Sequence, residues 1–368
     1  MIHKGRARIN KAPGSLIALN TMRKLKYLLV YLLPVSVYLS FQRSGLFTFL
    51  PVFTVFVLVP LLELFLPADH SNLEKDAYLQ EKSSKLYDWI LYLAVPVQVG
   101  LLVYFLFTIE QTPYPTVTFF GRTVAMGLLC GVLGINIGHE LGHRPERFNQ
   151  FLGEILLLSS LNTHFLPYHN EGHHREVATP QDPATAKRGQ SLFSFWFTSH
   201  FGSYVKAWKI ENKRMQRQSR ASWSLYNRMV AYSLANLLVL GSILYVFGWK
   251  GLLAFVLAAV IGILLLETVN YIEHYGLLRE KTASGRYERV RHVHSWNSDH
   301  QIGRLMLFNL SRHSDHHYKA SKKYQVLDSL PDSPQMPTGY PGMMVLALLQ
   351  PLWFSVMNRK LDLLQGNS

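Results

Sequence analysis

Three short histidine clusters are the residues of this chain best suited to chemistry. Each contains a pair of histidines four positions apart, a spacing that places both imidazoles on one side of a helix. The clusters are His139 with His143, His169 with His173 and His174, and His313 with His316 and His317. A neutral imidazole binds a metal ion through one nitrogen while a neighbouring group holds the other. The repeated spacing therefore predicts a metal centre, and the last cluster by itself resembles a complete triad on one helix face.

The set of donors narrows the choice of metal. The chain has 16 histidines, of which 14 lie between residues 139 and 317, and its single cysteine, Cys130, lies in an apolar run. Imidazoles without thiolates favour iron, copper or zinc over a hard cation, and two ions accommodate eight or nine histidines where one does not. The first cluster alone, with Glu140 inside it, also matches the zinc-protease pattern. A zinc protease needs one further ligand, whereas this chain offers many more.

Several carboxylates lie inside or beside the clusters. Glu140, Asp182, Glu273 and Asp315 are expected to accept hydrogen bonds from imidazole N–H groups and so to orient the rings. Asp315 falls on a helix face turned away from the histidines of its own cluster, where it is expected to orient a neighbouring imidazole. Glu267, at the end of an apolar run, is a rare acid near membrane depth and therefore a functional candidate.

Apolar helices are the elements that must position these residues. The chain is 49% hydrophobic and only 16% charged, against about 25% charged residues in soluble domains. Runs long enough to cross a bilayer occupy about residues 25–42, 46–66, 86–107, 118–138, 229–248 and 251–272. We therefore expect an all-α polytopic membrane protein with six transmembrane helices, in which residues 1–368 form a single membrane-embedded catalytic domain. The apolar stretch 343–357 contains Pro351 and is expected to dock rather than span.

The basic residues predict which side of the membrane carries the chemistry. The net charge is +14, and 34 of the 37 Lys and Arg residues fall in four segments. These segments are residues 1–26, 67–85, 139–228 and 273–368. Because cytoplasmic loops are rich in Lys and Arg, we expect both termini and the two large polar segments to form a cytoplasmic helical cap that holds the metal. Arg43, Arg122 and Lys250 are left for the opposite side. The charge is then a topology signal, and nucleic acid is not an expected partner.

The arrangement of the clusters resembles a known family. The patterns HxxxH, HxxxHH and HxxHH, set between pairs of membrane spans, resemble the integral-membrane non-haem diiron desaturases and hydroxylases. Finer matches resemble the alkane 1-monooxygenases, or alkane hydroxylases, of that superfamily. They lie at residues 139–144, 169–183, 270–277, 294–297, 310–317 and 337–341. The resemblance covers nearly the whole chain, and the set of matches is highly specific.

The resemblance implies which residues form the site. Nine histidines match the iron ligands of the family: His139, His143, His169, His173, His174, His274, His313, His316 and His317. His164, His294 and His300 also match family positions and are expected only to support the site. Tyr168 stands where the family usually has Glu, so any hydrogen bond from that Glu is lost. Related proteins with short substrates carry a bulky residue near the position of Val55, and the smaller valine is consistent with a longer substrate channel.

The resemblance also implies the reaction. The family hydroxylates the terminal methyl group of an n-alkane with O2 at two iron ions, giving a primary alcohol and water. Its two electrons come from rubredoxin, supplied by rubredoxin reductase and NADH, and no flavin or nicotinamide fingerprint is visible in this chain. A basic cytoplasmic face suits a small acidic partner. We therefore expect a multi-pass protein of the bacterial inner (cytoplasmic) membrane, where the substrate partitions into the lipid bilayer.

Three alternatives remain open at this point. A fatty-acyl desaturase or a xylene-type hydroxylase would use the same iron chemistry, and product analysis separates them. A membrane zinc protease is more remote; it would retain zinc and cleave peptides. A metal transporter should carry its histidines or acids inside the spans, whereas here the clusters follow the ends of the spans.

Overall fold

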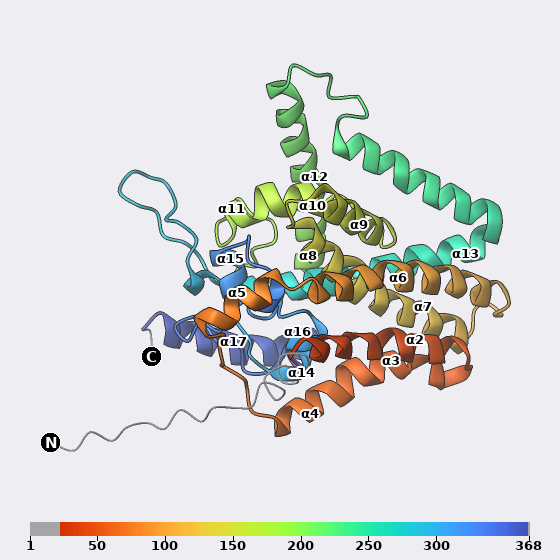
Figure 1. Ribbon diagram of the computed structural model, residues 1–368, viewed down its shortest axis with the longest axis horizontal. Coiled ribbons are helices and arrows are strands. Elements are labelled where there is room, and N and C mark those ends of the chain that lie inside the picture. Colours follow the sequence, from red (N-terminus) through yellow and green to blue (C-terminus); the bar gives the residue numbers. More distant parts are fainter. Residues whose placement is uncertain (1–22, 367–368) are drawn as a thin grey trace.

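The computed structural model describes residues 23–366, and the regular secondary structure of this part of the chain consists of helices joined by loops (Figure 1). No β-strand occurs within these residues; two isolated bridges join Lys281 to Tyr287 and Asn297 to Gln335. The predicted basic tail at residues 1–26 falls almost entirely outside the described residues. The long apolar helices make this an all-α, multi-pass membrane protein, as expected from the sequence.

The first half of the chain forms the helices that carry the first cluster. They are η1 (Lys26–Tyr31), α2 (Leu32–Phe41), η2 (Gly45–Phe49), α3 (Leu50–Phe53), η3 (Thr54–Leu58), α4 (Val59–Phe65), α5 (Lys75–Ser83), α6 (Leu86–Glu110), α7 (Val117–Leu129), η4 (Cys130–Ile137), α8 (Gly138–Gly142) and α9 (Arg147–Leu158). The segments η3 and η4 are π-helical, and they continue the helices on either side of them.

The second half carries the other two clusters. Its helices are α10 (Phe165–Tyr168), the π-helical η5 (His169–His173), α11 (His174–Glu176), α12 (Leu192–Arg217), α13 (Arg228–His274), η6 (His292–His294), α14 (Gln301–Met306), α15 (His313–Tyr318), η7 (Tyr324–Val326), α16 (Tyr340–Leu348) and α17 (Gln350–Leu364). The short helices α10, α11, α14 and α15 lie at the end of the bundle of long helices (Figure 1).

Five stretches within residues 23–366 are long and apolar enough to cross a membrane. They are Arg23–Phe41, Gly45–Phe65, Lys75–Glu110, Val117–Gly142 and Arg228–His274. The first four agree with predicted spans. The last contains both of the remaining predicted spans, 229–248 and 251–272, as parts of α13.

A glycine interrupts α13 where the turn was expected. Gly248 has φ 61° and ψ −171°, a backbone conformation that glycine adopts without the penalty a side chain would bring. The two parts of α13 fold back beside one another from this point (Figure 1). Residues 228–247 and 249–274 each exceed the roughly 17 residues that a membrane span needs.

Small residues allow the second part of α13 to lie against the helix that carries the first cluster. A Cβ atom on Gly127 would stand 2.6 Å from the Ile261 side chain, and one on Gly262 would stand 2.8 Å from Cys130. Close backbone approach at small residues is a common way to pack helices in membranes. It brings the ends of η4 and α13, and hence His139 and His274, to the same region.

The stretch predicted to dock does so as two helices, α16 and α17, which meet at Leu349. Trp353, Met357 and Leu361 are spaced four apart and fully buried, so they form one apolar face of α17. The Trp353 ring centroid lies 5.1 Å from that of Tyr271 on α13. This contact supports the last turns of α13, directly before His274.

Candidate metal centre

The structure brings the nine histidines together as two groups. The five-histidine group consists of His139, His143, His169, His174 and His316, and the four-histidine group of His173, His274, His313 and His317. In each group one ring nitrogen per histidine lies within 4.8 Å of the corresponding atoms of the others. No histidine of the expected ligand set lies outside these two groups.

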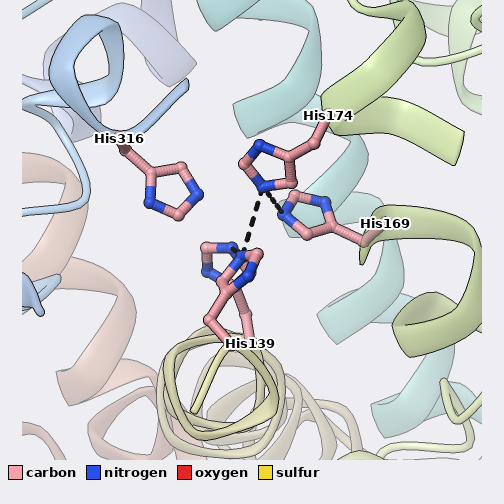
Figure 2. A group of neighbouring side chains, drawn as sticks. His139, His169, His174 and His316 are labelled. Atoms are coloured by element: carbon pink, nitrogen blue, oxygen red, sulfur yellow. Dashed lines mark hydrogen bonds between the residues drawn. The ribbon is translucent and has the colours of Figure 1, made fainter. Parts of the chain in front are cut away.

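The five-histidine group has the spacing of ligands around one ion. The Nε2 atoms of His139 and His143 are 2.8 Å apart, and His174 Nε2 lies 3.0 Å from His169 Nε2 and 3.3 Å from His143 Nε2. Nitrogens bound to one ion at about 2.1 Å and at right angles would be about 3.0 Å apart. Figure 2 shows the rings of this group arranged around one shared space, with His316 approaching from another part of the chain.

The four-histidine group shows the same convergence. Its His274 and His313 have their Nε2 atoms 3.2 Å apart. The Nε2 atom of His173 and both ring nitrogens of His317 are buried without a hydrogen-bond partner. Buried polar atoms are rarely left unpaired in proteins, and a bound metal ion would supply the missing partner. Both groups therefore fit metal ions, and donors that are all neutral imidazoles suit iron.

Burial keeps the ligand rings in the neutral form that binds metal. It lowers the pKa of His169, His174 and His317 well below the usual value, and repulsion from neighbouring imidazoles lowers these values further. Burial, together with the neighbouring His173, lowers the pKa of His316 to about 3. A ring nitrogen that carries no proton at neutral pH is free to coordinate an ion.

Each of the last two clusters is divided between the groups, so residues 313–317 share their partners with the other clusters and do not form a separate triad. On α15, His313 and His317 belong to the four-histidine group, whereas His316 faces the five-histidine group. Adjacent helical residues point about 100° apart, so α15 places donors in both groups when it lies between them.

The second cluster is divided for a different reason. We expected His169 to pair with His173, but it pairs with His174, and His173 belongs to the other group. Residues His169–His173 form a π-helix, η5, which has more residues per turn than an α-helix and so shifts the facing pair by one position. Such segments occur frequently at functional sites.

Close packing fixes the first cluster. A Cβ atom on Gly142, inside the His139–His143 pattern, would stand 2.1 Å from Leu166 Cδ2, and one on Gly153 would stand 2.8 Å from the Gly138 carbonyl oxygen. Since α8 can approach α10 and α9 so closely only without side chains at Gly142 and Gly153, the two glycines set the position of the His139 and His143 rings.

Charged groups fix the third cluster. The buried Arg312 guanidinium, directly before His313, donates hydrogen bonds to Asp299 Oδ1 at 3.1 Å and to the Leu327 carbonyl at 2.7 Å. At the other side of α15, Asp315 accepts hydrogen bonds from Lys322 Nζ and from the Asp328 backbone. These contacts tie α15 to the surrounding loops, so its histidines keep a defined orientation.

Two of the four expected carboxylates contact an imidazole. Asp182 Oδ2 lies 2.9 Å from His173 Nδ1, and Glu273 Oε2 lies 3.2 Å from His313 Nε2. Burial alone would raise the pKa of Asp182, but His173 and two hydroxyl groups that donate to the carboxylate lower it below its usual value. The ionised Asp182 therefore orients His173 and increases its basicity as a ligand.

The other two carboxylates have partners that differ from those expected. Glu140 accepts a hydrogen bond from Arg144 at 2.7 Å, and Asp315 pairs with Lys322 at 2.7 Å. Both are buried, and a buried carboxylate needs a cation or several donors nearby. Arg144 and Lys322 meet this need, so Glu140 and Asp315 brace helices rather than orient imidazoles.

The structure shows what Tyr168 does in place of the usual Glu. Its hydroxyl group donates a hydrogen bond to Asp182, the carboxylate that holds His173, and accepts one from the Ala184 backbone at 3.2 Å. The substitution thus leaves the second cluster with a hydrogen bond to a ligand-supporting group, made through a tyrosine hydroxyl.

The three supporting histidines lie outside both groups. His164 Nε2 is 3.4 Å from the Ser203 hydroxyl, and His300 Nδ1 is 3.1 Å from the Ser298 hydroxyl. His294 Nε2 lies 3.1 Å from Glu288, and its other ring nitrogen accepts the Arg291 backbone N–H. All three are held by non-ligand partners, as support residues would be.

An apolar cavity of about 860 Å³, including its open mouth, reaches both histidine groups. Part of its wall is formed by His139 and His169 of the five-histidine group and by His313 of the four-histidine group. Val55, which is far from these histidines in the sequence, also lines the cavity. All three π-helical segments contribute to the wall: η3 with Val55, η4 with Ile135 and η5 with His169. The site is thus reached through an apolar space, with Val55 on its surface.

Sequence reasoning did not single out the polar wall residue Asn136. Asn136 lines the cavity three positions before His139, and its buried Nδ2 atom has no hydrogen-bond partner. The signal was available, because an asparagine in an otherwise apolar membrane span is rare and tends to be functional.

Comparisons with known proteins agree with this geometry. The model of the fatty acid desaturase family matches residues 114–347. Alkane 1-monooxygenase 1 of Pseudomonas aeruginosa is 36% identical over 95% of this chain and 93% of its own length. Alkane 1-monooxygenase 1 of Alcanivorax borkumensis is 38% identical over 81% and 73%. A xylene/toluene monooxygenase hydroxylase component of Pseudomonas putida is 26% identical over 91% and 88%. The chain therefore belongs to the fatty acid desaturase family and, within it, to the alkane 1-monooxygenases.

Proposed function

We propose that this protein hydroxylates the terminal methyl group of n-alkanes with O2, giving primary alcohols. The observation that carries the proposal is the apolar cavity, because it ends at histidines of both groups and offers few polar atoms along its length. A saturated chain has no polar handle, so only shape and apolar contact can align it. The names of the relatives support the same substrate class.

The nine histidines are proposed to hold two iron ions, one in each group. When bound, the iron would supply the activation of O2 that no amino-acid side chain can provide. The protein would contribute position: the cavity wall directs one end of the alkane toward His139, His169 and His313. It would also exclude bulk water from the reacting end. Val55 lies where it would limit the length of chain that fits.

Rubredoxin is the proposed electron donor, itself reduced by rubredoxin reductase and NADH. The surface following α13 supports an acidic partner, because Lys281, Arg286, Arg289 and Arg291 are all exposed there and opposite charges steer association. Raising the salt concentration from 0.05 to about 0.5 M should weaken the interaction. An affinity for rubredoxin that salt does not change would contradict this docking surface.

The proposed topology is six passes through the bacterial inner membrane, with residues 139–228 and 273–368 on the cytoplasmic side. The few basic residues expected on the opposite side of the membrane support this topology. Arg122 donates to the Arg43 carbonyl at 3.0 Å and to Thr112, whose own carbonyl accepts from Lys250 at 3.0 Å. These three residues thus gather at one end of the bundle. In this topology α13 crosses the membrane twice and turns at Gly248. The whole chain is proposed to form a single catalytic domain.

The decisive experiment uses iron-loaded protein with rubredoxin, its reductase and NADH, offered n-alkanes of graded length. We expect 1-alkanols and two iron ions per chain. Parallel reactions with xylene and with a fatty-acyl substrate separate the related chemistries, since one relative acts as a xylene/toluene monooxygenase component. Absence of 1-alkanol at every chain length would refute the substrate assignment, and zinc without iron would refute the oxygenase itself.

A further inference from the structure

A buried acid lies close to the cavity without belonging to either histidine group. Glu267 is 2% exposed and lies on α13, seven residues before His274. Placing a carboxyl group within an apolar membrane helix is costly, and such groups usually serve a function. The metal ligands and the groups that orient them do not include Glu267.

The two carboxylate oxygens of Glu267 face different compartments. Oε2 accepts a hydrogen bond from Asn270 Nδ2 at 3.2 Å, and Asn270 lines the apolar cavity beside the metal ligands. Oε1 lies 3.9 Å from His200 Nδ1 on α12, just beyond direct hydrogen-bond distance. That nitrogen is buried and has no hydrogen-bond partner, so Glu267 is the acid toward which it is directed.

His200 belongs to a second, polar pocket of about 380 Å³. The pocket lies between α12, the start of α13 and the residues before α10, and is lined by His164, His200, Tyr204, Ser233 and Asn236 among others. The His200 side chain is 27% exposed, so it reaches the molecular surface at one side and Glu267 at the other. Glu267 therefore lies between the polar pocket and the apolar cavity.

The proposed reaction consumes protons, and this arrangement can supply them. One alkane, one O2, two electrons and two protons give one alcohol and one water. The electrons come from the reductant, but the protons must cross an apolar wall, and the iron ligands are neutral imidazoles with no proton to give. Other acids near the groups are engaged: Asp182 with His173, and Glu273 with Tyr340 at 2.7 Å.

We propose that Glu267 delivers protons from the polar pocket to the oxygen-reducing end of the cavity. His200 takes a proton from solvent and passes it to Glu267 Oε1; Glu267 then releases a proton toward the cavity, where Asn270 orders the accepting water. Each cycle leaves His200 and Glu267 in their starting states, and two cycles serve one turnover. Glu267 does not contact the reacting atoms and is thus a positioning and relay residue. The inference rests on the proposed function.

The first test is Glu267→Gln, which keeps the shape and an acceptor for Asn270 but cannot carry a proton. We expect two iron ions per chain and normal alkane binding, with 1-alkanol formation slowed by about 10²-fold, the usual size of a lost proton-transfer group. Slower product formation should be accompanied by a larger rate difference between H2O and D2O. His200→Gln should show the same pattern to a smaller degree.

A second test separates proton delivery from structural support. In Glu267→Ala, formate can enter through the polar pocket and should restore a measurable part of the rate, which a purely structural defect would not allow. Glu63→Gln is the matched control: Glu63 is 3% exposed on a membrane helix, accepts the Gly303 backbone N–H at 2.8 Å and is absent from the walls of both compartments. It should show neither the solvent isotope effect nor the formate response.

The outcomes distinguish this inference from the proposed function. If the unaltered protein makes 1-alkanol but Glu267→Gln is equally fast with the same D2O rate, the relay is refuted and the function stands. The relay is also refuted if Glu267→Gln is slow but neither the isotope effect nor formate rescue appears. If the unaltered, iron-loaded protein makes no 1-alkanol, the proposed function fails before the variants are compared.

Discussion

The two histidine groups are built from the same part of the fold but differ in what surrounds them. The four-histidine group contacts two carboxylates, Asp182 through His173 and Glu273 through His313. Within residues 23–366, no carboxylate oxygen lies within 4.0 Å of a ring nitrogen of the five-histidine group. The acids adjacent to its histidines in the sequence, Glu140 and Asp315, are paired with Arg144 and Lys322.

If each group binds an ion as proposed, this difference would give two ways to hold a divalent cation with neutral ligands. The five-histidine group relies on the number of donors, each contributed by a packed helix. The four-histidine group has one donor fewer but has negative charge next to it. Asp182 contacts the Nδ1 atom of His173, on the far side from the convergent Nε2, where a carboxylate strengthens the bond from an imidazole to a metal. We therefore expect the iron affinity of the four-histidine site to depend on the neighbouring carboxylates. The iron affinity of the five-histidine site should depend mainly on its histidines.

The largest effect should come from removing one ligand of each group. His174→Ala and His173→Ala alter adjacent residues that face different groups, so each should reduce the iron content from two ions per chain to about one and abolish 1-alkanol formation. His313→Ala should behave like His173→Ala. Metal analysis of purified protein provides the measurement, and full iron loading in any variant would remove that histidine from the ligand set.

A smaller effect is expected from the carboxylate that orients a ligand. Asp182→Asn keeps the size of the side chain but removes the charge that holds His173, so it should weaken iron binding at the four-histidine site by about 10- to 100-fold. Glu140→Gln is the matched control, because Glu140 contacts Arg144 rather than an imidazole. Competition with a chelator measures the iron affinity of both variants. Equal losses of affinity in the two would contradict the role of Asp182 in orienting His173.

Tyr168 should have a weaker influence on the same site. Tyr168→Phe removes only the hydroxyl group that donates to Asp182, and one lost hydrogen bond of about 1 kcal/mol corresponds to roughly a fivefold change in affinity. Iron titration should show this change at the four-histidine site alone. Tyr324→Phe, which loses a buried hydroxyl contact to the Tyr87 carbonyl instead, should leave both iron affinities unaltered.

The smallest effect on the metal, and a clear effect on the substrate, is expected at Val55. Val55→Trp should leave iron at both sites while lowering the yield from long n-alkanes at least about tenfold relative to short ones, since added bulk in a pocket excludes longer chains. Val57→Trp is the control, because Val57 lies on the same helix but is 40% exposed and does not line the cavity. An unchanged product range in Val55→Trp would argue against the channel.

Much of the architecture could be predicted from sequence because its signals are local. Apolar runs gave four membrane helices close to the observed ones. A turn was expected at residues 248–251, where glycines flank Trp249 and Lys250, and Gly248 leaves the helical conformation there. The partners of Glu140 and Asp315 were mispredicted. Their cations, Arg144 and Lys322, are near in sequence, but nothing local favours them over an imidazole.

By itself, the sequence predicted three histidine clusters suited to a metal centre, from the spacing of four residues and the single cysteine, and the nine expected ligands followed from the resemblance to the family. Only the tertiary structure decided how they are shared. The five-to-four division arises because η5 is a π-helix and because α15 lies between the two groups. Both are tied to residues outside these segments: Arg312 anchors α15 to Asp299 and Leu327, and Asp182 holds His173 of η5. Chain order alone carries no information about those contacts.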